Sequence, residues 1–190
     1  MDRKGKAVMK KSLKICYSAV FMAMSLFLPF LTGQIPQIGN MLLPMHFGVM
    51  LCGLICGPFY GLFIGFVTPL LRSVTFGMPP LMPNAAAMAF ELAAYGFVTG
   101  IIYTRFKGSK IALFAALLAA MLAGRAVWGI ASIVFYGFAD KTFTWAIFFA
   151  GAFIKAIPGI VLQIILIPML VIIYEKYFEP RILAKTQEAK

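Results

Sequence analysis

The chain has 190 residues, of which 62% are hydrophobic and only 12% are charged. Soluble domains carry about 25% charged residues, so this composition excludes an ordinary soluble globular protein and indicates an integral membrane protein. The length suits one compact helical bundle and leaves no room for a separate soluble domain. The formal net charge of +11 lies mostly in three short hydrophilic segments, a distribution that favours membrane topology over nucleic-acid binding.

The first apolar regions predict three helices. Residues 1–12 form a basic segment, and the apolar run 13–31 ends without a small-x-small cleavage site, so we expect an uncleaved first transmembrane helix. A polar loop, 32–40, leads into an apolar stretch over 41–76. As one helix that stretch would be roughly 54 Å long against a hydrocarbon core of about 30 Å, so it must break. The expected break is the Gly57-Pro58 pair.

The second half of the chain predicts three more spans. We expect a Pro-rich loop at 77–83, spans at 84–103, 111–135 and 143–174, and a basic tail at 176–190. The last span is longer than one crossing and contains Pro158, so we expect a tilt, a kink at that proline or a re-entrant start. The predicted fold is an all-α integral membrane protein, a compact bundle of six transmembrane helices within residues 13–175.

The basic residues predict the orientation of this bundle. Residues 1–14, the turn at 105–110 and the tail together hold thirteen of the seventeen Lys and Arg residues. All three fall on one side of a six-span bundle. The positive-inside rule then places both termini in the cytoplasm.

The cysteines predict neither a disulfide framework nor a metal site. Cys52 and Cys56 lie four residues apart, and Cys16 stands alone in the first apolar run. No second cysteine pair and no histidine cluster accompanies them, so buried apolar side chains are the expected role. We expect no metal and no cofactor.

Four charged residues lie inside or at the edge of apolar runs: Arg72, Glu91, Arg125 and Lys155. A charge at the bilayer centre costs at least about 2.5–3.5 kcal/mol, so such residues usually face a cavity or a partner. The predicted topology places all four, together with His46, in the outer half of the membrane. Three of the four are cationic, which favours an anionic ligand.

Helical spacing groups these charges with polar and aromatic companions. Spacings of three or four residues put each of three sets on one helical face: Asn84, Met88, Glu91 and Tyr95; Arg125, Trp128, Ser132 and Tyr136; and Lys155, Gly159 and Gln163. The three faces are expected to converge on a cavity open to the outside, with Gln37 and Asn40 of the polar loop above its mouth. The predicted substrate-binding set is Arg125, Lys155, Glu91, Trp128, Tyr95, Asn84, Gln163, His46, Arg72, Gln37 and Asn40.

Structural roles compete with ligand binding for several of these residues. Glu91 can pair with Arg125 or Lys155 to hold the bundle together, but it cannot neutralise three cations. Arg72 can extend to the interface, and His46 can serve as a hydrogen-bonded cap at the membrane surface. Trp128 can be an ordinary packing residue.

Small residues recur at four-residue spacing, which lets helices approach closely in lipid. Gly53, Gly57, Gly61 and Gly65 are expected to pack inside the bundle, as are Gly96 and Gly100. Ala19 and Ala23 form another such pair on a first helix that carries no charge after Lys14. We expect these two alanines to contact a partner in the membrane.

Six spans, an outward cavity and this Ala-xxx-Ala pair look like one family. The run from Leu43 to Gly61, which ends in Gly-Pro-Phe-Tyr-Gly, resembles the second and third helices of the substrate-binding S components of energy-coupling factor (ECF) vitamin transporters. The resemblance covers about residues 10–178. It implies a multi-pass protein of the bacterial cytoplasmic membrane. Such a protein captures a vitamin from outside and docks through Ala19 and Ala23 on a transmembrane coupling (T) component driven by two ATPase subunits.

The substrate and the rival functions stay open at this point. The cationic excess favours a carboxylate-bearing compound, pantothenate first, while the aromatic residues also allow pyridoxine or a queuosine precursor. A stand-alone secondary transporter is the main alternative, although it would need internal repeats or broken helices at the midplane. An intramembrane enzyme would need a nucleophile with a base or a metal cluster. With one His and no Gly-x-Ser-x-Gly or Walker A motif, neither catalytic residues nor ATP hydrolysis is expected.

Overall fold

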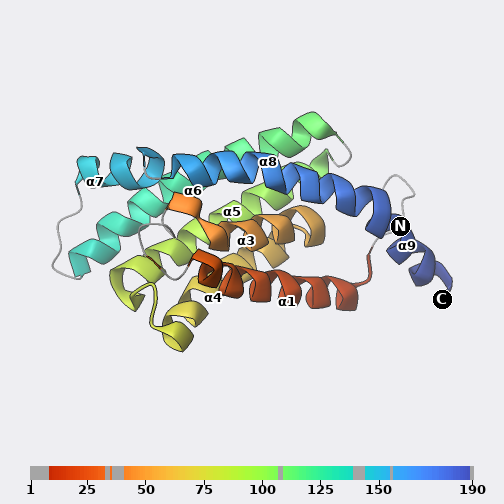
Figure 1. Cartoon of the computed structure of the whole chain (residues 1–190), viewed down its shortest axis with the longest axis horizontal. Coiled ribbons are helices and arrows are strands. Elements are labelled where there is room, and N and C mark those ends of the chain that lie inside the picture. Colours follow the sequence, from red (N-terminus) through yellow and green to blue (C-terminus); the bar gives the residue numbers. More distant parts are fainter. Residues whose placement is uncertain are drawn as a thin grey trace.

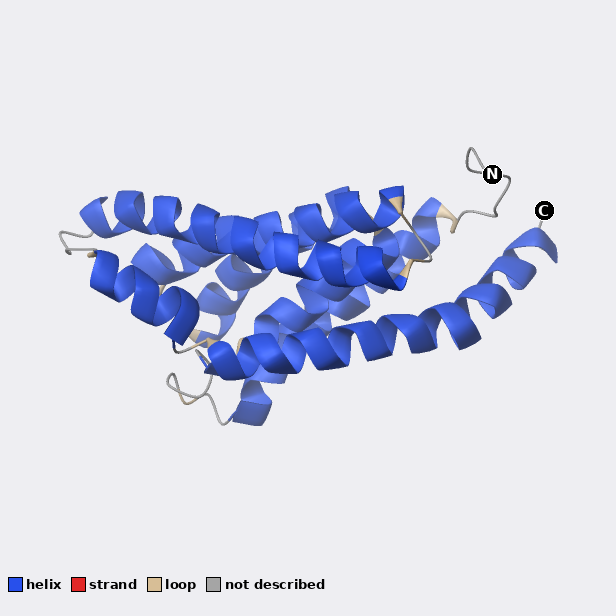
Figure 2. Ribbon diagram, turned by 90° about the horizontal axis from the view of Figure 1, so that it is seen from above, coloured by secondary structure: helices blue, strands red, loops and turns tan. Residues whose placement is uncertain are grey.

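The computed structural model describes residues 9–32, 35, 41–106, 109–138, 144–154 and 156–188. All regular secondary structure in this part of the chain is helical. The long helices lie roughly along one common direction (Figures 1 and 2). The predicted all-α architecture is therefore confirmed.

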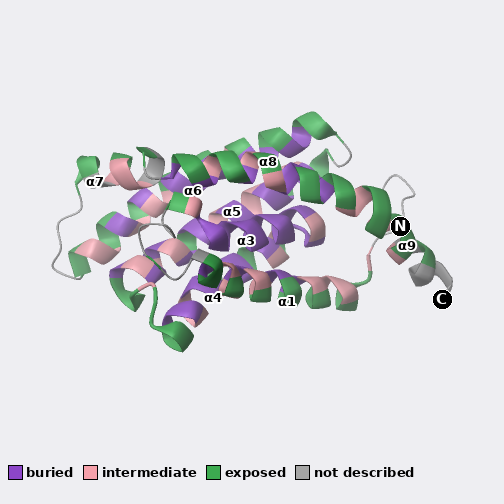
Figure 3. Cartoon of the chain, viewed as in Figure 1, coloured by how far each residue is buried: buried purple, intermediate pink, exposed green. Residues whose placement is uncertain are grey.

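Helix α3 (Pro44–Cys56) forms the centre of the bundle. Nearly all of its residues are buried (Figure 3), and it packs against α1 (Lys11–Phe27), α4 (Pro58–Phe76), α5 (Ala86–Arg105) and α8 (Ile157–Ile173). Its apolar sequence is explained by this position, because a helix that is hydrophobic on all sides is buried on all sides.

The predicted break between the second and third helices is confirmed. Gly57 has a φ of 110°, a conformation that glycine adopts without the steric cost of a Cβ, and it separates α3 from α4. Pro58 then begins α4 at a position where its missing N–H removes no helical hydrogen bond. The two helices consequently fold back on one another.

The predicted sixth helix is interrupted. Helix α7 (Trp145–Phe149) is followed by a wide helical turn, Ala150–Ile154, and α8 begins at Ile157 with Pro158 in its first turn. The break lies just before the proline that was expected to kink this segment. Beyond α8, the turn Tyr174–Phe178 leads into α9 (Glu179–Glu188), so the basic tail is itself helical.

Five helical segments are long and apolar enough to cross a membrane: Lys11–Leu31, Pro58–Phe76, Leu81–Arg105, Lys110–Phe138 and Ile157–Ile182. The third of these joins a turn at Leu81–Ala85 to α5, and the fourth is α6. Helix α3 has 13 residues, and its length of about 20 Å is less than the usual hydrocarbon thickness. The protein is thus a multi-pass membrane protein, and the count of six crossings stays a prediction.

Glycines allow α4 and α5 to cross with almost no space between their backbones. A Cβ placed on Gly61 would lie 2.5 Å from the carbonyl oxygen of Gly96, and one placed on Gly96 would meet the backbone of Gly61. Gly65 and Gly100 make similarly close approaches. The expected internal packing role of these glycines is confirmed, as small residues permit such contacts in lipid.

The two ends of the bundle differ in what they contain. The start of α1, the end of α5, the start of α6 and α9 lie at one end, whereas α7 lies at the other (Figure 1). The described basic residues at the start of α1, at the end of α5, at the start of α6 and in α9 therefore lie at the same end of the bundle.

Candidate functional site

A cavity of about 500 Å³ is lined in part by α7 and the turn that follows it. These elements lie at the end of the bundle distant from α9 (Figure 1). The cavity walls come from the start of α3, the turn before α5, α5 itself, α6, α7 and the turn that follows α7. This volume falls within the range of about 300–1,000 Å³ that is typical of small-molecule sites. The cavity is lined by Leu43, His46, Pro79, Asn84, Met88, Glu91, Arg125, Trp128, Tyr136, Ala146, Ala150 and Gly151.

A buried ion pair forms the polar part of the cavity wall. Arg125 Nη1 on α6 donates to Glu91 Oε1 on α5 at 2.7 Å, and the two residues are 6% and 2% exposed. His46 Nε2 lies 3.6 Å from the same carboxylate oxygen, and His46 is 1% exposed. The Glu91 carboxylate thus lies beside both the Arg125 guanidinium of α6 and the His46 imidazole of α3.

Several polar atoms beside this ion pair have unused hydrogen-bonding capacity. Within the described residues, Arg125 Nε and Nη2 and both ring nitrogens of His46 find no hydrogen-bond partner. Leaving such groups buried and unsatisfied costs about 1–3 kcal/mol each, and more for charged groups. A bound ligand with matching acceptors and donors would remove that cost. The unpartnered nitrogens of Arg125 and His46 therefore favour a ligand-binding site here.

Aromatic and amide side chains form another part of the wall. Tyr136 donates to Asn84 Oδ1 at 3.1 Å, which links α6 to the turn before α5. The Trp128 ring stacks on Phe148 at a centroid distance of 6.0 Å and an interplanar angle of 23°. Gly151 lies against the Trp128 ring, where an added Cβ would be 3.0 Å away. The wall therefore combines flat apolar surface with a few fixed polar groups.

The structure brings five of the predicted binding residues together in this cavity: Arg125, Glu91, Trp128, Asn84 and His46. Two of the predicted helical faces, those containing Glu91 and Arg125, converge as expected. The pairing of Glu91 with Arg125 was one of the structural alternatives, and it is present.

Two more predicted residues contact residues of the cavity wall without lining the cavity. Tyr95 packs edge-on against His46, with ring centroids 5.0 Å apart. Gln163 Nε2 donates to the Leu43 carbonyl at 3.4 Å. Leu43 has the left-handed backbone conformation, with a φ of 50°, immediately before α3. Gln163 therefore contacts a residue of the cavity wall without lining the cavity itself.

Arg72 lies apart from the cavity wall. Its Nη1 donates to the carbonyl oxygen of Leu26 at 2.5 Å, and its guanidinium lies 5.1 Å from the ring of Phe30 and 5.4 Å from that of Phe76. These contacts give the buried cation a hydrogen bond and two cation–π interactions. The other predicted residues, Lys155, Gln37 and Asn40, lie outside the described residues.

Sequence reasoning missed five residues of the wall: Leu43, Pro79, Ala146, Ala150 and Gly151. They are small or apolar, and such residues are common everywhere in a membrane chain. Ala146, Ala150 and Gly151 lie near one sequence signal, Pro158, where the last apolar segment was expected to kink and before which it is interrupted. That interruption brings α7 and its following turn to the cavity.

The predicted partner-binding residues lie on a different surface. Ala19 and Ala23 are exposed on α1. Ala19 also lines a shallow apolar groove of about 420 Å³ between α1 and α4, together with Met22, Phe59 and Phe63.

A multi-pass helical bundle that encloses a mostly apolar cavity with a few buried hydrogen-bonding groups belongs to the class of membrane proteins that bind small solutes. In the described residues, no group of three or more His, Cys, Asp or Glu side chains is placed to hold a metal. The family described as ECF transporter, substrate-specific component, matches residues 13–171, and the chain belongs to this family. No curated protein and no solved structure gives a significant match.

Family membership identifies the chain as a substrate-binding subunit of an ECF transporter. Such subunits associate with a transmembrane coupling component and ATPases, and they bind a small molecule. The resemblance found in the sequence is thereby confirmed.

Proposed function

We propose that the cavity between α3, α5, α6 and α7 captures a water-soluble vitamin or related micronutrient from outside the cell. The observation that carries this proposal is the set of unpartnered Arg125 and His46 nitrogens beside the Glu91 carboxylate. Part of the cavity wall, α7, lies at the end of the bundle away from the described basic residues (Figure 1). With the basic end in the cytoplasm of a bacterial cell, as the positive-inside rule requires, the cavity faces outward.

The ligand in this proposal is anionic, with pantothenate as the first candidate. The Glu91–Arg125 pair balances one positive charge, but two nitrogens of Arg125, Nε and Nη2, keep their N–H groups for a ligand acceptor. Charge-assisted hydrogen bonds from guanidinium to carboxylate are among the stronger polar contacts in proteins. The aromatic wall at Trp128 also accommodates a flat ring, so pyridoxine and a queuosine precursor are the compounds to compare with pantothenate.

Release inside the cell requires the ATP-driven coupling module in this proposal. The exposed alanines at 19 and 23 let a partner helix approach α1 closely, because small residues bring helix backbones together in lipid. The groove at Ala19 extends this apolar surface onto α4. The T component is the proposed occupant, and the two ATPase subunits supply the hydrolysis.

The proposal is tested by calorimetric titration of the purified protein in detergent, without ATP. One of the three candidate compounds should bind at one site per chain. Arg125→Ala should weaken that binding by about 1.5–3 kcal/mol through the loss of a charge-assisted hydrogen bond. Arg105→Ala is the matched control, because Arg105 is exposed in the last turn of α5 at the basic end.

Two outcomes would contradict the proposal. Equal substrate affinity in the wild type and in Arg125→Ala would show that Arg125 does not contact the substrate. Substrate uptake that persists in cells without the coupling component and ATPases would favour the stand-alone secondary transporter instead.

A further inference from the structure

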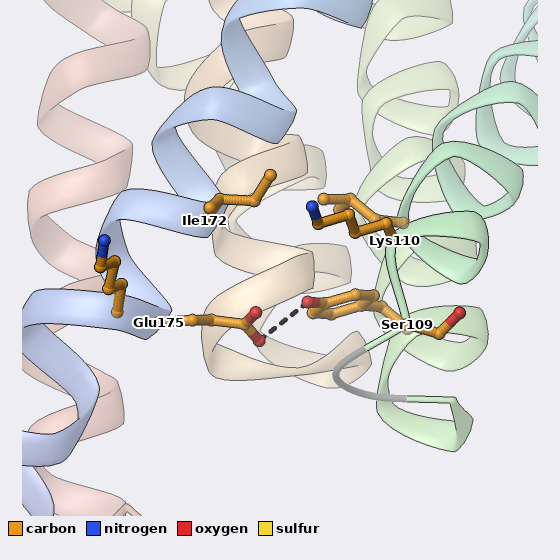
Figure 4. Close-up of a pocket in the computed structure, with 7 residues that line it drawn as sticks. Ser109, Lys110, Ile172 and Glu175 are labelled. Atoms are coloured by element: carbon orange, nitrogen blue, oxygen red, sulfur yellow. Dashed lines mark hydrogen bonds between the residues drawn. The ribbon is translucent and has the colours of Figure 1, made fainter.

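A second cavity, of about 260 Å³, opens at the basic end of the bundle. It lies between the end of α5, the start of α6 and the turn that follows α8, and Figure 4 shows its walls. Its charged lining residues are Lys110, Glu175 and Lys176, accompanied by Tyr103 and Ile172. The substrate cavity described above has no lining residue in common with it.

The Glu175 carboxylate is held at one side of this cavity. Tyr103 donates its hydroxyl to Glu175 Oε1 at 2.8 Å, across the space between α5 and the turn after α8 (Figure 4). Tyr103 is almost completely buried, so this hydrogen bond fixes the carboxylate from the protein interior. The carboxylate therefore contributes a stationary negative charge to one wall.

The two lysines leave the cavity with a positive balance. Lys110 begins α6 and projects on the wall opposite Glu175 (Figure 4). Neither Lys110 nor Lys176 forms an ion pair with a carboxylate in the described part of the chain. The Lys176 ammonium lies 5.2 Å from the Tyr177 ring. Two ammonium groups and one carboxylate give a formal charge of +1, which matches a ligand with one negative charge.

Apolar surface continues from the cavity along the bundle. Ile172 is both a lining residue and 38% exposed, and Ile111, one residue after Lys110, is 82% exposed. Both belong to segments apolar enough to cross a membrane. A ligand seated here therefore meets charge at one end and lipid-facing hydrocarbon at the other, which requires an amphiphile.

We propose that this cavity binds the headgroup of a phospholipid that carries one net negative charge, of the phosphatidylglycerol type. The phosphodiester lies between Lys110 and Lys176, the headgroup hydroxyls donate to Glu175, and the acyl chains follow the surface at Ile172. Basic pockets at helix ends on the cytoplasmic side are a known way to recognise anionic lipids. Glu175 selects against headgroups with two negative charges, because a second charge would face its carboxylate.

The test is native mass spectrometry of the full chain in detergent, with phosphatidylglycerol, phosphatidylethanolamine or phosphatidylcholine added in turn. Phosphatidylglycerol should be retained one per protein and the other two much less. Lys110→Gln with Lys176→Gln should reduce retention about fivefold for each lysine, or about thirtyfold together. Lys10→Gln with Lys11→Gln is the control, because it removes the same charge from exposed positions at the same end.

A second variant tests the selectivity. Glu175→Gln should raise the retention of dianionic phosphatidic acid relative to phosphatidylglycerol. Three results would overturn the proposal: unchanged retention in the Lys110 and Lys176 variant, equal loss in the control variant, or equal retention of all three lipids. Displacement of the lipid by millimolar inorganic phosphate would identify the site as one for free phosphate instead. None of these readouts depends on which vitamin the protein binds.

Discussion

Arg125 Nη1 and Glu91 Oε1 lie 2.7 Å apart, and both side chains are buried. The two residues are 34 positions apart in the sequence and join α5 to α6. Burying two charges costs several kcal/mol per ion unless they are paired and hydrogen-bonded. The pair is thus both a connection between two helices and part of the wall of the proposed substrate cavity.

Removing one member of this pair should destabilise the protein more than removing both. Arg125→Met or Glu91→Leu leaves an uncompensated buried charge, which costs about 3–5 kcal/mol. The double variant leaves none, so its unfolding temperature in detergent should lie closer to that of the wild type. Substrate affinity should be reduced in all three variants. Additive losses of stability in the double variant would contradict coupling between the two residues.

Arg72→Met should reduce stability and leave substrate affinity intact. The substitution removes the hydrogen bond to Leu26 and the contacts with Phe30 and Phe76. The expected cost is about 1–3 kcal/mol. Thermal unfolding and calorimetric titration of the same preparation measure the two effects. A variant that unfolds at the wild-type temperature but binds substrate poorly would show that Arg72 belongs to the binding site.

Ala19→Leu and Ala23→Leu should separate binding from transport. Both positions are exposed on α1, so a larger side chain does not disturb the bundle or the distant cavity. It does hold a partner helix away, because close approach depends on small residues. Affinity for substrate should be unchanged, and uptake into vesicles with the coupling module should fall at least about tenfold. Val20→Leu, at an exposed neighbouring position, is the control. Normal uptake in both alanine variants would rule out the docking role.

Gly61→Ala should destabilise the bundle by about 1–3 kcal/mol, because the added methyl group meets the Gly96 carbonyl oxygen 2.5 Å away. Gly137→Ala makes the same chemical change where no atom lies within 4 Å, and it should be neutral or slightly stabilising. Thermal unfolding compares the two variants. Similar unfolding temperatures would mean that the α4–α5 crossing relaxes without cost.

The residues of the substrate cavity were predictable to different degrees. Glu91 and Arg125 could be found because charge is rare and costly inside apolar runs, and helical spacing then added Asn84 and Trp128. Ala146, Ala150 and Gly151 could not, because small apolar residues carry no signal of their own. Arg72 has the same sequence signature as Arg125. Tertiary packing distinguishes the two, because it brings the Leu26 carbonyl and the rings of Phe30 and Phe76 beside Arg72, and the Glu91 carboxylate beside Arg125.

Composition and periodicity alone determined the class of protein, most of the helical segments and the break at Gly57, because each depends on local chemistry. A hydrophobic run of sufficient length must be a helix in a bilayer, since every backbone polar group has to be satisfied within it. Other features depend on contacts between distant segments. They are the pairing of Glu91 with Arg125, the hydrogen bond from Gln163 to the Leu43 carbonyl and the shape of both cavities. Those contacts arise from how helices pack against one another, which no local pattern specifies.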